Sequence, residues 1–248
     1  MRWRLASGVL VACWAAAAGA GAQENKKAVS FTGDVGLVNT AGNTHLTTFN
    51  LGDKLTAQAG KALFTQTFAL VYGKSDSVQT ANSQLVRLRM DYALGPRLSA
   101  YSFAGYERYR FAGIDHRLDE GVGLAATPWR NAANELGVEA GVGLVQERLL
   151  SDPALDLTRR HNFVAGRAAA KYKHSFSKAT YFQQTLEFLP NLETSGDYRV
   201  NSESALVAPL SSHLGLKASY LLKHNHAPPS PSLAKTDRML TTGLQVSY

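Results

Sequence analysis

Hydrophobic and polar residues alternate along most of the chain beyond residue 28, with the repeat of two that is typical of strands. Alternation of this kind predicts strands whose two faces meet different surroundings. Turn residues divide the pattern into segments of roughly ten residues, which predict about twelve strands. We expect the strands at 29–38, 45–56, 62–73, 83–94, 98–111, 116–126, 134–148, 160–174, 179–189, 198–208, 212–224 and 236–248.

Each segment has one apolar row and one polar or charged row. In 83–94 the apolar row is Val86, Leu88, Met90 and Tyr92, and the opposite row is Arg87, Arg89 and Asp91. The segments 134–148 and 212–224 repeat this scheme. A charged side chain costs about 2–4 kcal/mol at the middle of a bilayer, so we expect the charged rows to face the inside of a closed barrel. Asp53 and the segment 106–109 break the alternation, and a β-bulge at each place would restore it.

The connections between segments alternate in length. Tight joints at 59–62, 95–97, 176–178 and 209–211 are separated by longer polar links at 74–82, 149–159, 190–197 and 225–235. The last link contains a proline-rich stretch, 227–231, which we interpret as a stiff surface loop. Together these features predict an all-β fold, a transmembrane antiparallel β-barrel of about twelve strands with short periplasmic turns and longer extracellular loops.

Aromatic residues gather near the ends of the predicted strands. The residues near the outer ends are Tyr72, Tyr109, Phe111, Phe188 and Tyr198, and those near the periplasmic ends are Tyr92, Tyr101, Tyr172, Phe182 and Tyr248. Two such groups predict aromatic girdles at the two membrane interfaces. The alternative is ordinary core packing in a soluble β-protein.

The two ends of the chain indicate export and assembly. Arg2 and Arg4, an apolar stretch at 5–18 and small residues at 20–22 predict a cleavable signal peptide over residues 1–22, with the outer-membrane β-barrel domain at 23–248. In an alternative reading, residues 10–13 form a lipobox and Cys13 is lipidated. At the other end, a terminal aromatic resembles the signal read by the barrel-assembly machinery, on an apolar face made of Leu240, Thr242, Leu244, Val246 and Tyr248.

Composition narrows the chemistry further. The chain has 26 basic and 19 acidic residues, and removing Arg2 and Arg4 with the signal leaves 24 − 19, a formal charge of +5. We assign this charge to soluble loops and turns, because an exported chain has little use for nucleic acid. The single cysteine leaves with the signal, so no disulfide, thiolate nucleophile or cysteine metal site is expected. We therefore expect outer-membrane lipid and the assembly machinery as partners, and no cofactor.

Several short motifs occur in a characteristic order. They are Gly42-Asn43-Thr44, Asp91-Tyr92, the segment 106–111 followed by Gly113 and Arg117, Gly121-Val122-Gly123, and Glu139-Ala140-Gly141. In this order and spacing the chain resembles the salt-induced outer-membrane protein family, a domain-of-unknown-function family of small outer-membrane β-barrels. The resemblance covers essentially the whole mature chain. It implies a barrel in the outer membrane of a Gram-negative bacterium, and it supplies no catalytic or binding residues.

Charged residues of the fourth to seventh strands are the candidate lumen residues. They are Arg87, Arg89, Asp91, Arg108, Arg110, Arg117, Asp119, Glu135, Glu139 and Glu147, with room left by Gly121, Gly123, Gly137, Gly141 and Gly143. One interpretation is a narrow channel for small solutes or ions, because arginine forks hold carboxylates and phosphates. The other is a plugged barrel in a structural or osmotic-stress-responsive envelope protein, whose charges pair across strands.

An outer-membrane hydrolase is the contrasting class. Its candidate histidines are His116, His161, His224 and His226, and none lies in a hydrolase signature. We therefore predict that the protein is not an enzyme. His224 and His226 point to one side of a predicted strand and have a spacing that suits a divalent metal. We prefer the simpler interpretation that they are polar residues at the edge of a loop.

Overall fold

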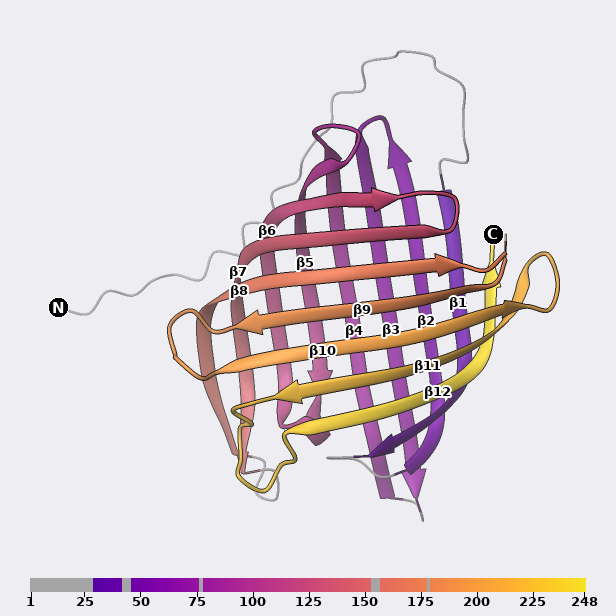
Figure 1. Cartoon of the computed structure of the whole chain (residues 1–248). Coiled ribbons are helices and arrows are strands. Elements are labelled where there is room, and N and C mark those ends of the chain that lie inside the picture. The colour runs from indigo at the N-terminus through magenta and orange to yellow at the C-terminus, as the bar shows by residue number, and fades with distance from the viewer. Residues whose placement is uncertain (1–28, 42–45, 76–77, 153–156, 178) are drawn as a thin grey trace.

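The computed structural model describes residues 29–41, 46–75, 78–152, 157–177 and 179–248, which form a closed antiparallel barrel of twelve strands (Figure 1). The strands are β1 (Val29–Ala41), β2 (Leu46–Ala59), β3 (Ala62–Ser75), β4 (Val78–Ala93), β5 (Leu98–Tyr109), β6 (Ile114–Arg130), β7 (Asn134–Asp152), β8 (Leu157–Ser175), β9 (Tyr181–Pro190), β10 (Tyr198–Pro209), β11 (Leu214–Asn225) and β12 (Thr236–Ser247). A single 3₁₀ turn, η1 (Arg110–Ala112), is the one helical element of the described chain. The predicted number and order of strands are confirmed.

The barrel closes between its first and last strands. The register of β1 against β12 runs from Thr32 opposite Ser247 to Ala41 opposite Arg238. At the end of this ladder, Tyr248 N donates to Phe31 O at 2.9 Å, and Phe31 N donates to Tyr248 O at 3.1 Å. Closure gives every strand two neighbours, so no edge is left unpaired.

No helix in the described part of the chain has the length and apolarity needed to cross a membrane.

The outer face of the barrel is apolar and exposed. Leu88 and Val122 are each 57% exposed, Val142 is 52% and Leu216 is 50%. Leu88, Val142 and Leu216 belong to rows predicted to face outward. The C-terminal row behaves in the same way, since Leu240 is 49% exposed. A water-soluble protein rarely leaves so much large apolar surface uncovered.

Charged side chains interrupt the apolar outer rows at several places. β2 pairs without a register shift on either side, so Asp53 keeps the outward phase of Leu51 and Leu55, and the bulge expected there is wrong. A register shift between Glu107 and Tyr109 does occur in the pairing of β5 with β6, as expected, but it does not bring both charges inside. Glu107 faces the lumen, and Arg108 lies opposite Gln84 on the outward phase. Glu120, opposite Leu144, is also exposed on the outside.

The connections differ from the expected alternation of length. β3 reaches Ser75 before β4 begins at Val78, and β7 reaches Asp152 before β8 begins at Leu157, so the expected long links at 74–82 and 149–159 are short. Backbone pairing does not require apolar side chains, and polar strands can therefore continue past the apolar band. Only 191–197 and 226–235 are long, and we call the end of the barrel that carries them the loop end and the opposite end the turn end.

The expected aromatic girdles are present in part. Tyr72, Tyr92, Phe188 and Tyr248 are between 41% and 63% exposed on the outer face. Tyr101 and Tyr109 are instead 3% and 4% exposed, because their phase in β5 points inward. The position of these two residues along the strand predicted their height in the barrel, but not the face of the sheet from which they project.

Some expectations lie outside the described residues. These are the signal peptide at 1–22, the lipobox cysteine Cys13, the Gly42-Asn43-Thr44 motif and the side chain of Phe111.

Candidate functional site

A network of ion pairs crosses the middle of the barrel interior. Arg89 of β4 donates to both carboxylate oxygens of Asp91, from Nε at 2.8 Å and from Nη2 at 2.7 Å. Its Nη1 donates to Glu139 Oε2 of β7 at 2.8 Å. Arg167 of β8 donates to the same oxygen of Glu139, and its Nε donates to Glu187 Oε1 at 2.8 Å. Because β4 and β7 are not neighbours in the sheet, the contact between Arg89 and Glu139 runs through the lumen.

Tyr101 lies at the centre of this network. The Arg89 guanidinium lies 4.2 Å from the centre of its ring, and Arg167 Nη1 donates to its hydroxyl at 3.1 Å. Gly123 and Gly141 face each other on β6 and β7, and a Cβ on either would lie 2.5 Å from the Tyr101 hydroxyl. The two glycines therefore accommodate a ring of the barrel itself, and they do not leave the open space in the lumen that their sequence pattern predicts.

A second group of charges spans the full width of the barrel nearer the loop end. Lys223 of β11 donates from Nζ to Glu107 Oε1 of β5 at 2.8 Å, and these strands are six positions apart in either direction round the barrel. Arg117 donates from Nη1 to Glu107 Oε2 at 2.9 Å and from Nε to Glu147 Oε2 at 2.7 Å. His161 Nδ1 lies 3.0 Å from Glu147 Oε1. Two buried carboxylates are thus shared by three basic side chains, which satisfies charges that would be costly to bury alone.

The connection between β11 and β12 covers the loop end. A Cβ on Gly113, which precedes β6, would lie 2.7 Å from Leu233 Cδ1 and 3.0 Å from Pro229 Cγ. The connection therefore reaches across to β5 and β6 rather than pointing away from the barrel, as a simple surface loop would. Near it, inward residues of four strands form a buried apolar cluster of Tyr109, Ile114, Leu149 and Met239.

Cavities remain between these groups of side chains. One of about 320 Å³ is lined mainly by strands β4 to β11, and one of about 450 Å³ mainly by β1 to β3 and β9 to β12. Glu203 and Leu221 line both of them. A third, of about 210 Å³, shares Arg117 and Arg199 with the first. At about 30 Å³ per water molecule, the first cavity has room for roughly ten waters.

Some lumen cations lack a carboxylate partner among the described residues. Arg199 of β10 lines the 320 Å³ and 210 Å³ cavities and forms no ion pair or hydrogen bond there. Lys54 of β2 and Lys171 of β8 line the 450 Å³ cavity from opposite sides of the barrel and interact electrostatically with each other. Neither lysine forms an ion pair with a carboxylate of the described residues. By contrast, Lys217 pairs with Asp34 at 2.7 Å in the same cavity.

A family model described as "Protein of unknown function, DUF481" matches residues 33–248. The chain belongs to the DUF481 family. A comparison of the sequence of this chain with curated proteins found no match.

Solved structures share the fold of this DUF481 barrel at low sequence identity. The NanC porin is 9% identical, with a TM-score of 0.59, over 86% of this chain and 98% of that one. An outer-membrane channel from Pseudomonas putida F1 is 10% identical, with a TM-score of 0.52, over 89% and 94%. The translocator domain of the autotransporter NalP from Neisseria meningitidis is 14% identical, with a TM-score of 0.52, over 90% and 89%. These similarities establish the twelve-stranded barrel architecture.

Most of the candidate lumen residues of the DUF481 barrel lie in the two networks. These are Arg89, Asp91, Arg117, Glu139 and Glu147, together with Arg87, whose Nη2 donates to Asp119 Oδ2 at 3.0 Å.

Three of the candidate residues lie elsewhere. Arg108 is on the outward phase, Arg110 lies in η1 and donates to Asp115 at 2.6 Å, and Glu135 pairs with exposed Arg130 at the turn end. Arg108 faces outward because β5 alternates without a break against β4, with Glu107 and Tyr109 inside, and Arg110 lies beyond the end of β5 at Tyr109.

Sequence reasoning missed the partners that come from the far wall. Tyr101, Arg167, Glu187, Arg199 and Lys223 complete the networks, and four of them belong to β8 to β11. Their inward phase was readable from the alternation in each strand. Which inward residues meet across the lumen depends on the tilt and register of the closed barrel, and alternation within a strand carries no such information.

The four candidate histidines take part in different contacts in the described part of the chain. His116 lies 3.3 Å from Asp115, and His224 Nδ1 lies 2.9 Å from Thr236 Oγ1. His226 stacks on Tyr198, with ring centres 4.7 Å apart. No group of three or more potential metal ligands occurs among these residues.

Proposed function

We propose that this DUF481 protein is an integral outer-membrane barrel whose lumen is a narrow path for small solutes. The observation that carries the proposal is the pair of cavities of about 320 and 450 Å³ inside the barrel, which share the lining residues Glu203 and Leu221. Only side chains separate them, and side chains can rearrange far more easily than strands. No cofactor and no catalytic step enter this function.

The outer face supports the membrane location. Exposed apolar rows are what lipid requires of the outside of a barrel, and closure pairs every strand with two neighbours. In the proposal, residues 1–22 direct export to the periplasm of a Gram-negative cell. The C-terminal strand ending in Tyr248 is then read by the barrel-assembly machinery, and lipid surrounds the finished wall.

The ion pairs would act as the selective part of the path. Arg89, Glu139 and Arg167 meet around Tyr101, so a solute passing this level must move between fixed charges of both signs. Rings of charged side chains set selectivity in narrow pores because they replace part of the hydration shell of the ion.

A structural envelope protein with a closed lumen is the second candidate. The contact of Lys223 with Glu107 across the whole barrel and the cover of the loop end by residues 226–235 favour it. A response to salt, which the family resemblance implies, stays a prediction under either function.

Single-channel recording in a planar bilayer separates the two candidates. The purified protein, shown to be folded by its heat-dependent gel mobility, is expected to give small discrete conductance steps. A folded protein that inserts into the bilayer and gives no steps would contradict the channel and support the closed barrel.

A further inference from the structure

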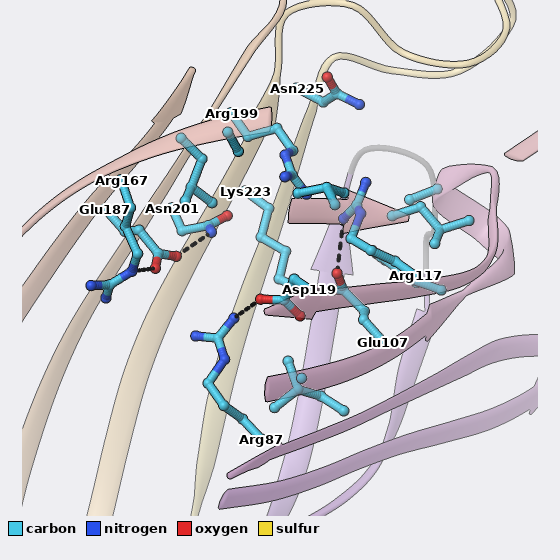
Figure 2. A pocket seen from close by; sticks show the side chains of 18 of the residues that line it. Arg87, Glu107, Arg117, Asp119, Arg167, Glu187, Arg199, Asn201, Lys223 and Asn225 are labelled. Atoms are coloured by element: carbon cyan, nitrogen blue, oxygen red, sulfur yellow. Dashed lines mark hydrogen bonds and ion pairs between the residues drawn. The ribbon is translucent and has the colours of Figure 1, made fainter. Parts of the chain in front are cut away.

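Arg199 stands apart from the other lumen arginines. Its side chain points into the 320 Å³ cavity with Arg117 nearby, and it also borders the 210 Å³ cavity (Figure 2). The dashed contacts of Figure 2 join Arg87, Arg117 and Arg167 to carboxylates, whereas none reaches Arg199. A guanidinium has five N–H donors, so all five are available here to water or to a ligand.

Charges of both signs surround this side chain. Arg199 interacts electrostatically with Arg117 and with the carboxylates of Glu147, Glu107 and Asp119. Lys223 pairs with Glu107 and Arg87 pairs with Asp119, and two further carboxylates, Glu203 and Asp237, line the same cavity.

The three carboxylates of this group are already bound. Glu107 accepts from Lys223 and Arg117, Glu147 accepts from Arg117, and Asp119 accepts from Arg87. Glu203, which also lines the cavity, interacts electrostatically with Lys217. Turning Asp119 toward Arg199 would therefore leave Arg87 without this ion pair, and turning Glu107 would leave Lys223 without its own.

From this geometry we infer that Arg199 is the centre of a binding site for a small oxyanion, a solute that carries one carboxylate or phosphate group. The guanidinium fork binds such groups through two parallel hydrogen bonds. Asn225 and Asn201 line the same cavity, and Asn225 can supply a further donor, because its Oδ1 is engaged by Ala227 N at 3.2 Å while its amide nitrogen is not. Asn201 is already occupied, since its amide donates to Glu187 at 2.8 Å.

The neighbouring cavity gives independent support for an anionic ligand. Lys54 and Lys171 approach its interior from opposite walls and have no carboxylate partner among the described residues. Unpaired cations thus occur on both sides of the central network, whereas its arginines are paired. The statement that oxyanions are the solutes of the path rests on the proposed function. The binding site at Arg199 does not, because an oxyanion can bind in the cavity whether or not the barrel conducts.

Equilibrium binding tests the site without requiring conduction. The folded protein in detergent is heated in sodium phosphate, in sodium acetate, or in sodium chloride of the same ionic strength, and unfolding is followed by gel mobility. A ligand that binds only the folded state raises the apparent Tm in proportion to the logarithm of its concentration. We expect a rise in phosphate or in acetate, and the more effective of the two identifies the chemical class.

Two variants and a control locate the effect. In Arg199→Gln the apparent affinity should fall roughly tenfold or more, since hydrogen bonds to charged groups are lost, and Arg199→Lys should recover part of it. Arg130→Gln, at the exposed turn end, should behave like the wild type. An equal rise in Arg199→Gln, or no rise above chloride in the wild type, would overturn the site.

Conductance separates failure of the site from failure of the channel. Oxyanion binding at Arg199 in a barrel that gives no steps would refute the proposed path and leave the site intact. Conductance steps together with an apparent Tm that does not change in phosphate or acetate would refute the site and leave the proposed path intact.

Discussion

Gly141 tests how closely the aromatic ring of Tyr101 is packed against the lumen wall. In Gly141→Ala the added Cβ would lie 2.5 Å from the Tyr101 hydroxyl, 2.5 Å from Val122 O and 3.1 Å from Gly123 Cα. Two of these neighbours are backbone atoms of β6, which cannot move without disturbing the ladder. Overpacking of this kind costs about 1–3 kcal/mol, so we expect Gly141→Ala to destabilise the barrel by that amount.

Gly137→Ala is the matched control, since both glycines lie on β7 and face the lumen. Its Cβ would lie 3.9 Å from Ala126 O and Lys171 O, which is ordinary contact. Replacing glycine by alanine without strain usually stabilises a protein by about 0.4–1 kcal/mol, through the unfolded chain. The two variants should therefore move in opposite directions.

Urea unfolding in lipid vesicles measures the difference. Of the three tryptophans only Trp129 lies beyond the predicted signal, so it reports on the barrel alone. With a slope of about 2 kcal/mol per molar urea, a loss of about 2 kcal/mol moves the midpoint down by about 1 M. If Gly141→Ala unfolds at the same urea concentration as Gly137→Ala, the packing of Tyr101 on these glycines is not as close as described.

Three further predictions concern other parts of the barrel. Tyr101→Phe removes an acceptor from Arg167 and should lower stability in urea by about 1 kcal/mol; an unchanged midpoint would mean that this hydrogen bond contributes nothing. Asp53→Leu removes an outward carboxylate whose Oδ1 is buried and has no partner among the described residues, and should raise stability by about 1–3 kcal/mol; a lower stability would indicate a partner outside the chain. Tyr248→Ser should slow assembly in cells while leaving refolding in detergent unchanged, and normal surface levels of this variant would contradict an assembly role.

The alternation of residues predicted the barrel well because it reflects a strong energetic constraint. Each strand must keep an apolar side toward the outside, so the rows around Leu88, Val142 and Leu216 were readable from spacing alone. Where the constraint weakens, prediction failed. Within the polar segments 74–82 and 149–159, strands run to Ser75 and Asp152 and begin again at Val78 and Leu157, since strands extending past an apolar band have no requirement for apolar residues.

The sequence predicted which residues of a strand face the lumen, but not which of them meet across it. Arg89, Glu139 and Arg117 were identified from β4, β6 and β7, whereas the partners Arg167 and Lys223 lie on strands far along the sequence. Glu107 and Arg108 are neighbouring charges on opposite faces of β5, and the sequence did not show which of the two faces the lumen. The packing of Tyr101 against Gly123 and Gly141 could not be predicted from the sequence, because the two glycines are equally compatible with open space in the lumen.

The most direct test of the account is the conductance of a barrel from which the contact across the lumen has been removed. Glu107→Ala combined with Lys223→Ala deletes both ends of the 2.8 Å pair while Arg117 keeps Glu147. The control is Arg130→Ala combined with Glu135→Ala, an exposed pair at the turn end. If solutes pass through the lumen, the first variant gives larger single-channel steps than the wild type and the control does not. Steps of unchanged size in the first variant would contradict a path through this network.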